Sequence, residues 1–297
     1  MILSRDNPFY KDLPGLSVLI GGMWIMNVSY WGFNQYIIQR ALAAKDLAEA
    51  QKGVLFAAFL KLLMPVIVVL PGIAALMLVT DIEKPDQAYP KMMALLPTGV
   101  LGLVFAALIA AIVASLASKI NSVSTIFTLD FYNKRSRRAD ATPHDETHLV
   151  KVGRIAATVA IVLAVLTAKP LLGSFDQGFQ YIQEYTGFFT PGIVVIFVLG
   201  LFWKRANEAG AIAAAVGSFA LSIALKLAWP ELPFMDRVGL VFLLALALAV
   251  VVSLTLRASS DPNRIRTDDV SYATTSTFNA GAVGVIGILI ALYAAFW

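Results

Sequence analysis

The sequence predicts an all-α polytopic membrane protein with about eight transmembrane helices. Of its 297 residues, 59% are hydrophobic and 14% are charged, whereas soluble domains average about 45–50% apolar and about 25% charged residues. The apolar residues are collected into blocks of roughly 20, the length that crosses about 30 Å of hydrocarbon as a helix. A membrane barrel would instead show alternating segments of about 10 residues, and the chain has no such alternation.

Eight blocks are long enough to cross the bilayer. They are predicted at residues 15–38, 53–79, 97–128, 149–168, 174–202, 208–228, 237–256 and 278–297. The first block ends in a polar stretch, NVSYWGFNQYIIQR, and the fifth contains another, FQYIQEYTG. The third is rich in small residues, with the run FAALIAAIVASLASKINSVSTIFTLD. We expect these spans to form one transmembrane domain over residues 1–297.

The basic residues favour one side of the membrane. With eight spans, 14 of the 23 Lys and Arg are assigned to the loops and adjoining span ends of one side and 6 to those of the other, and 3 are assigned to spans: Lys61, Lys119 and Lys226. By the positive-inside rule the side with 14 is cytoplasmic. Both termini are therefore predicted to lie outside.

Several other chemistries are excluded or disfavoured. The chain has no cysteine, and its two histidines, His144 and His148, share a polar loop where a solvated role is far commoner than zinc binding. That loop, residues 133–148, fits a cytoplasmic segment near anionic lipid headgroups and not a nucleic-acid site. A membrane-embedded enzyme would need reactive groups at one depth, and neither histidine lies in a span. The loop at 80–97 fits an external lid and a plain connector equally well.

Polar side chains fall near the middle of three separate spans. At about 1.5 Å per residue, Asn27 lies about 18 Å from the outer edge and Lys61 about 13.5 Å from the inner edge. Gln183 and Glu184 lie about 15 Å inward on the fifth span. An ionisable residue at this depth costs about 2.5–3.5 kcal/mol on insertion scales. Lys61 is therefore expected to face a cavity or a partner.

The set Asn27, Lys61 and Gln183 has two interpretations. Amides donate and accept hydrogen bonds and lysine donates them, so the set suits a polyhydroxylated neutral solute. Alternatively, each side chain bonds a neighbouring helix and serves only packing. Taken together the three favour a binding cavity, because aromatic side chains are interleaved with them: Tyr30, Trp31, Phe33, Phe179 and Tyr181. Gly21-Gly22 and the polar cluster from Asn27 further predict a discontinuous helix beside that cavity.

The third span carries Ser115, Ser118, Ser122 and Ser124 on a small-residue face. Small residues let helices approach closely, so packing is one interpretation. The other is a sodium site, since the carbonyl of Ala111 and the hydroxyl of Ser115 lie four residues apart on one helix face.

Several segments closely resemble the sodium/solute symporter family, and within it the bacterial sodium/galactose members. The segments are YWGFNQYIIQR, AQKGVLFAAFLK, FAALIAAIVASLAS, FQYIQEYTG, LGLFWK and PFMD. The resemblance implies a LeuT-type fold of two inverted five-helix repeats, with alternating access around a central site. It implies sodium-coupled uptake of a galactose- or glucose-like sugar across the plasma membrane, the inner membrane of a bacterium, with no enzymatic step.

The resemblance also implies roles for particular residues. The sugar would contact Asn27, Lys61 and Gln183, and Tyr30 would stack on it as an inner-gate aromatic. The Ala111 carbonyl and Ser115 hydroxyl would bind the coupling ion, Na⁺. Where close relatives have a Ser-Ser pair, this chain has Ala114-Ser115, so one hydroxyl ligand is absent and the sodium site is incomplete.

The family carries about six further helices before the segment that this chain resembles. We therefore expect the chain to correspond to the second half of the inverted-repeat fold plus extra C-terminal helices. Alone it would not complete the transport cycle, and a separate upstream half could assemble with it. The alternatives are a truncated reading frame, a symporter of another solute such as inositol, a carboxylate or an amino acid, and a non-transporting membrane subunit.

Overall fold

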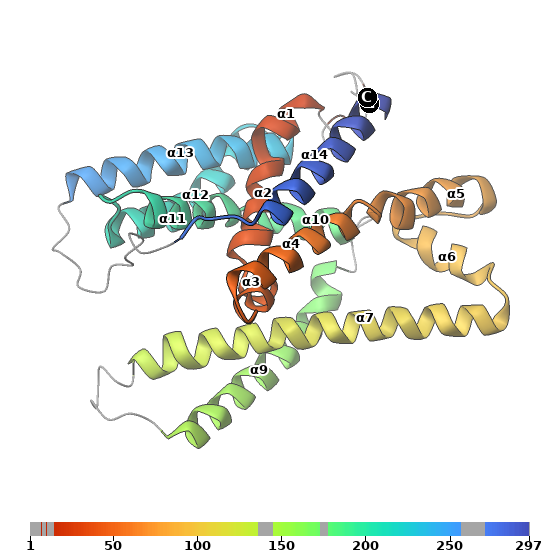
Figure 1. Ribbon diagram of the computed structural model, residues 1–297, viewed down its shortest axis with the longest axis horizontal. Coiled ribbons are helices and arrows are strands. Elements are labelled where there is room, and N and C mark those ends of the chain that lie inside the picture. The colour runs from red at the N-terminus through yellow and green to blue at the C-terminus, as the bar shows by residue number, and fades with distance from the viewer. Residues whose placement is uncertain are drawn as a thin grey trace. The chain divides into compact units, whose positions relative to one another are not determined.

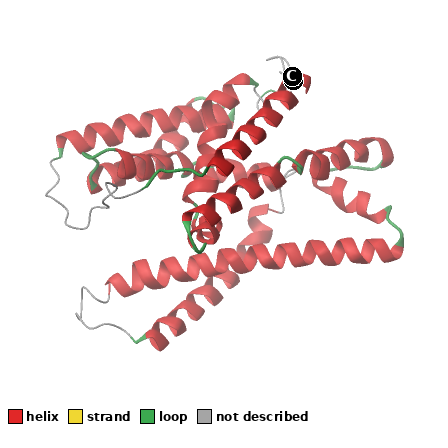
Figure 2. Ribbon diagram, in the orientation of Figure 1, coloured by secondary structure: helices red, strands yellow, loops and turns green. Residues whose placement is uncertain are grey.

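The computed structural model describes Asn7, Tyr10 and residues 15–135, 145–172, 178–256 and 271–296. Within these ranges every regular element is helical and none is a strand (Figure 2). Seven helices are long and apolar enough to cross a membrane, and a bent pair of helices makes an eighth. The prediction of an all-α polytopic membrane protein with about eight spans is confirmed.

The chain divides into two compact units. The first comprises Met1–Leu62 and Ile182–Trp297, and the second comprises Leu63–Tyr181.

The first unit contains the elements that carry most of the predicted site. They are α1 (Leu16–Val18), η1 (Leu19–Met23), α2 (Trp24–Val28), η2 (Ser29–Phe33), α3 (Gln35–Leu42), α4 (Leu47–Lys61), the part of α10 (Gly178–Thr186) from Ile182 onward, α11 (Thr190–Phe202), α12 (Glu208–Ala228), α13 (Phe234–Thr255) and α14 (Ser276–Phe296). Here η1 and η2 are π-helical turns. The helix α4 begins after Asp46, whose carboxylate caps it by accepting from the amide of Glu49 at 2.8 Å.

The core of this unit lies among α2, α11, α12 and α13. It contains Ile25, Val194, Val195, Ala214 and Ala245, all at most 1% exposed. In lipid the apolar surroundings give helices little hydrophobic reason to associate, so close van der Waals packing matters more. Small residues provide it here, and α12 and α13 run side by side (Figure 1).

A glycine crossing joins the first span to α13. A side chain on Gly22 would overlap the carbonyl oxygen of Met235, and a Cβ on Gly239 would lie 2.8 Å from the Cα of Gly21. The segment Leu16–Phe33 is helical throughout, and the chain leaves the helix at Asn34, which has φ −87° and ψ 115°. The helix is thus interrupted at Asn34, within the polar cluster from Asn27, whereas Gly21-Gly22 lie in the continuous π turn η1. These glycines permit close packing, and π turns keep the backbone hydrogen-bonded, as an apolar phase requires.

The fifth predicted span, residues 174–202, is also broken. The helices α10 and α11 bend by 43° at residues 187–189. Pro191 is the second residue of α11 and lies in its first turn, where its missing N–H costs no helical hydrogen bond.

The second unit contains two long apolar helices. Its elements are η3 (Pro65–Val69), α5 (Leu70–Leu78), η4 (Pro85–Gln87), α6 (Ala88–Ala94), α7 (Thr98–Thr125), η5 (Ile126–Asn133), α9 (Glu146–Leu172) and the start of α10. The helices α7 and α9 pack against each other (Figure 1). At their contact the hydroxyl of Ser124 donates to the carbonyl of Gly153 at 2.9 Å. Part of the predicted 80–97 loop is helical, because it contains η4 and α6. The helix α6 contacts both η4 and α5, which precede it in the chain.

Candidate functional site

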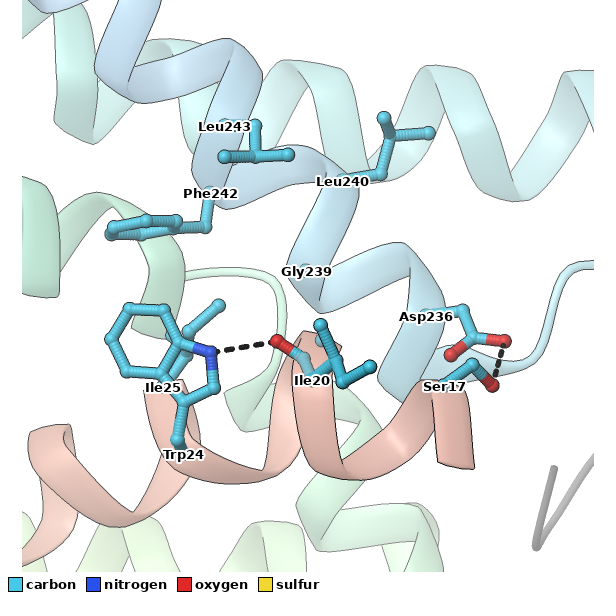
Figure 3. Close-up of a pocket in the computed structure, with 10 residues that line it drawn as sticks. Ser17, Ile20, Trp24, Ile25, Asp236, Gly239, Leu240, Phe242 and Leu243 are labelled. Atoms are coloured by element: carbon cyan, nitrogen blue, oxygen red, sulfur yellow. Dashed lines mark hydrogen bonds between the residues drawn. The ribbon is translucent and has the colours of Figure 1, made fainter. Parts of the chain in front are cut away.

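Asn27 lies on α2 and bonds to its own helix. Its side-chain nitrogen donates to the carbonyl of Met23, the last residue of the π turn η1, at 2.9 Å. The indole nitrogen of Trp24 donates in the same way to the carbonyl of Ile20 at 2.9 Å (Figure 3). Both side chains serve backbone carbonyls in an irregular helical segment. The amide oxygen and the second N–H of Asn27 remain chemically suited to a ligand.

Tyr30 and Lys61 are brought together around Trp31. The rings of Tyr30 and Trp31 meet edge to face with centroids 5.2 Å apart, and the ammonium of Lys61 lies 4.5 Å from the centroid of Trp31. On the other side, the hydroxyl of Tyr36 donates to that of Tyr30 at 2.6 Å. This cation–aromatic cluster, Tyr30, Trp31, Tyr36 and Lys61, joins two of the predicted substrate residues from different helices. An ammonium over an indole face is stabilised by about 0.5–1 kcal/mol at an exposed site.

Gln183 lies on a third element, α10, and is half-buried. Its backbone carbonyl accepts from the amide of Gly187 at 3.0 Å and from the hydroxyl of Thr186 at 2.9 Å, so the last turn of α10 is closed before the bend. Asn27, Lys61 and Gln183 belong to the same compact unit. In the part of the chain that the structure describes, no hydrogen bond or ion pair joins their side chains to one another.

Ala111 and Ser115 lie one turn apart on α7, in the second unit, and both are exposed. The other serines of this helix are half-buried or buried. Ser118 donates to the carbonyl of Ala114 at 3.1 Å, Ser122 is buried, and Ser124 bonds to α9. Packing against α9 therefore accounts for Ser124, whereas the exposed Ala111 and Ser115 remain a predicted sodium site. In the described residues no three acidic, histidine or cysteine side chains form a metal-binding group.

Both histidines had been expected in one solvated loop. His148 lies in the first turn of α9, where its Nε2 is 2.9 Å from the hydroxyl of Tyr132. His144 lies outside the described residues.

A charged cluster at the α10–α11 bend was missed by sequence reasoning. One carboxylate oxygen of Glu184 is 3.0 Å from Nη2 of Arg237 and 2.8 Å from Nζ of Lys226. The side chain of Arg237 is only 7% exposed. The pattern that could have revealed it is the occurrence of one carboxylate and two cations in apolar spans that are neighbours along the chain.

An apolar groove of about 530 Å³ lies between the first span and α13 (Figure 3). Ile20, Trp24 and Phe242 line its apolar part, and the rings of Trp24 and Phe242 meet edge to face at 5.1 Å. Ser17 donates to the carboxylate of Asp236 at 3.0 Å at its polar end. The groove is mostly hydrocarbon-lined, and its polar groups are confined to the Ser17–Asp236 end, so it suits a sugar poorly.

Comparison with known proteins decides the family. A sequence model described as the sodium:solute symporter family matches residues 4–217. The chain belongs to this family. The resemblance carried by the sequence motifs is thereby confirmed. The chain is a multi-pass membrane protein, and the family to which it belongs consists of transporters.

Three relatives are similar to this chain over different shares of their length. The sodium/glucose cotransporter of Vibrio parahaemolyticus is 47% identical over 315 aligned residues, covering 100% of this chain and 57% of that protein. The sodium/myo-inositol cotransporter 2 of Homo sapiens is 40% identical over 227, covering 70% and 32%. The sodium/mannose cotransporter of Bos taurus is 37% identical over 230, covering 71% and 37%. The chain spans just over half of the bacterial relative and about a third of the mammalian ones.

Proposed function

We propose that the protein is a sodium-coupled symporter of a galactose- or glucose-like sugar, or a part of one, in a bacterial inner membrane. It would work by alternating access in a LeuT-type fold, of which this chain is the second inverted repeat with further C-terminal helices, as one transporter domain. Sodium entering down its gradient would drive sugar uptake. Coupling would arise from binding alone, so the protein would not be an enzyme.

The cation–aromatic cluster is the observation that carries this proposal. A sugar ring has hydroxyls that accept from an ammonium and C–H faces that pack on aromatic rings. Lys61 offers the ammonium, Trp31 and Tyr30 offer the rings, and all three lie in a helical membrane unit. We assign further sugar contacts to Asn27 and Gln183. Tyr30, whose hydroxyl accepts from Tyr36, would stack on the sugar as the inner-gate aromatic.

The coupling ion is proposed to bind at the Ala111 carbonyl and the Ser115 hydroxyl. Hard cations prefer oxygen ligands, and both groups lie on one face of α7. Two oxygens do not complete a coordination shell, and Ala114 offers no hydroxyl. The remaining ligands would come from sequence equivalent to the part of the relatives that this chain does not span, on the same polypeptide or in a separate upstream half.

The direct test is sodium-driven uptake of radiolabelled galactose by the protein in liposomes, supplied with a separate upstream half where one exists. Lys61→Ala should raise the sugar Kd at least about tenfold, since a hydrogen bond to a charged group contributes about 1.5–3 kcal/mol. Lys52→Ala is the matched control, because Lys52 lies on the same helix and pairs only with nearby Glu49 among the described contacts, at 2.6 Å. Equal sugar affinity in both variants would contradict the assignment of Lys61.

A second candidate substrate is a cyclic polyol such as myo-inositol. It is favoured by the 40% identity to a sodium/myo-inositol cotransporter, and its hydroxyls suit the same donors and acceptors. Competition of unlabelled inositol, glucose, galactose and mannose against bound galactose separates the candidates. Weaker competition by every sugar than by inositol would favour the polyol.

A further inference from the structure

The bend between α10 and α11 is fastened to α12 by a buried serine. The hydroxyl of Ser218 donates to the carbonyl of Phe188 at 3.0 Å and accepts from the amide of Gly192 at 3.0 Å. A Cβ on Gly192 would lie 2.6 Å from the carbonyl of Ala214, so α11 and α12 are in close backbone contact. The α11 side of the bend is held by neutral hydrogen bonds and packing.

The α10 side of the bend is held by charge. Glu184 accepts from Arg237 of α13 and from Lys226 of α12, through the same carboxylate oxygen. Both cations also lie over the ring of Phe188, Arg237 at 5.3 Å and Lys226 at 5.6 Å from its centroid. We call Glu184, Lys226, Arg237 and Phe188 the bend cluster.

The position of Arg237 is electrostatically unfavourable without its partner. Arg237 lies in the first turn of α13, where the helix macrodipole disfavours a cation. It is also nearly fully buried, which adds a desolvation cost. Glu184 compensates both. Lys226, in contrast, lies in the last turn of α12, where the macrodipole favours its charge. The bend cluster therefore depends on the carboxylate, which two cations share.

The carboxylate directly follows Gln183, a proposed sugar contact. Successive residues of an α-helix point about 100° apart, so fixing the direction of one side chain fixes the rotation of the helix and hence the direction of the next. We infer that Glu184 is a positioning residue: the bend cluster sets the rotation and tilt of α10 and so aims Gln183 at the substrate. This inference rests on the proposed function for its substrate.

The absence of cysteine permits a direct measurement of the position of α10. Spin labels at Ile182→Cys on α10 and Leu227→Cys on α12 would report the separation of the two helices by pulsed EPR in the reconstituted protein. Both side chains are exposed, at 48% and 76%. Sugar affinity would be measured in parallel on the unlabelled protein by equilibrium binding of galactose.

We expect Glu184→Gln to broaden or shift the distance distribution and to weaken galactose binding up to about tenfold, because losing one directed hydrogen bond from Gln183 has an effect of this size. Arg237→Lys should largely keep the wild-type distance distribution and galactose affinity, since it retains the charge. Arg237→Gln should change the distance distribution and weaken galactose binding. Glu49→Gln, which removes an exposed ion pair of α4, is the matched control and should change neither. If Arg237 variants fail to fold, Lys226→Gln removes a half-exposed cation and should give a smaller loss of the same two kinds.

Unchanged distances in Glu184→Gln would overturn the inference. Changed distances with unchanged galactose affinity would also overturn it, since α10 would then move without affecting the substrate. Failure of the unmodified protein to bind any sugar would instead contradict the proposed function. The distances would in that case still show whether the bend cluster fixes α10.

Discussion

Single polar residues in the spans divide into those that satisfy the backbone and those that present a group outward. Asn27 donates to the carbonyl of Met23 on its own helix, so part of its role is structural. Lys61 is exposed and lies against an aromatic face. Packing and binding therefore stay open as alternatives at both residues, and the structure adds the one contact that each side chain makes.

The proposed sodium site predicts opposite effects on sodium affinity for removing the hydroxyl at Ser115 and for adding one at Ala114. Ser115→Ala should raise the sodium concentration for half-maximal uptake severalfold, because it removes a hydroxyl ligand. Ala114→Ser should lower it by adding one. The measurement is the sodium dependence of galactose uptake. Ser118→Ala is the control, since Ser118 bonds to the carbonyl of Ala114, and an equal effect there would contradict the assignment.

Among the elements, the first span and α13 are joined by backbone contact at their glycines. A Cβ added at Gly22 would meet backbone atoms of Met235. No side-chain rotation could therefore relieve the overlap caused by a larger residue at position 22. Helices in lipid are stabilised by such close approach. The Gly21-Gly22 pair, which suggested an unwound helix, is therefore a packing feature.

Gly22→Ala should destabilise the protein by about 1–3 kcal/mol through overpacking. Gly32→Ala tests the helix propensity alone, because it lies in the same helical stretch with no atom within 4 Å of an added Cβ. The measurement is the thermal unfolding midpoint in detergent. A midpoint lowered equally in both variants would show that the crossing is not tightly packed.

Two buried serines on α12 offer a second comparison. Ser218→Ala removes a partner from the carbonyl of Phe188 and the amide of Gly192, which should cost about 1–3 kcal/mol for buried polar groups left unsatisfied. Ser222 is equally buried, and its hydroxyl has no partner among the described residues. Ser222→Ala should therefore be near neutral. The measurement is the thermal unfolding midpoint of each variant. Midpoints lowered equally in the two variants would contradict the role of Ser218 at the bend.

For the whole molecule, the orientation in the membrane remains a prediction from the distribution of basic residues. A chain without cysteine is suited to accessibility labelling. Lys84→Cys should react with a membrane-impermeant maleimide on intact cells, whereas Arg135→Cys should react only after the cells are permeabilised, because the basic side is expected to be cytoplasmic. The reverse pattern would invert the topology and place both termini inside.

The composition and the apolar block lengths were enough to predict the membrane class, the helical fold and about eight spans, because the bilayer imposes its thickness on each span separately. The motifs were enough to predict the family. The candidate site was only partly predictable: Lys61 was selected by its depth and residue type and Tyr30 by the family resemblance, whereas the place of Trp31 between them depends on how η2 and α4 pack.

Only the tertiary structure decided which charges pair and where the spans bend. Arg237 and Glu184 are 53 residues apart in the chain, and neither residue type nor spacing specifies that they meet. The bend at residues 187–189, the helical continuity of Leu16–Phe33 and the glycine crossing likewise depend on contacts between helices. The length of a span is set by the thickness of the bilayer that it crosses, whereas the pairing of charges is set by which helices pack against each other. The sequence alone therefore determined the class and family of this protein, and its packed helices determined how α10 is held.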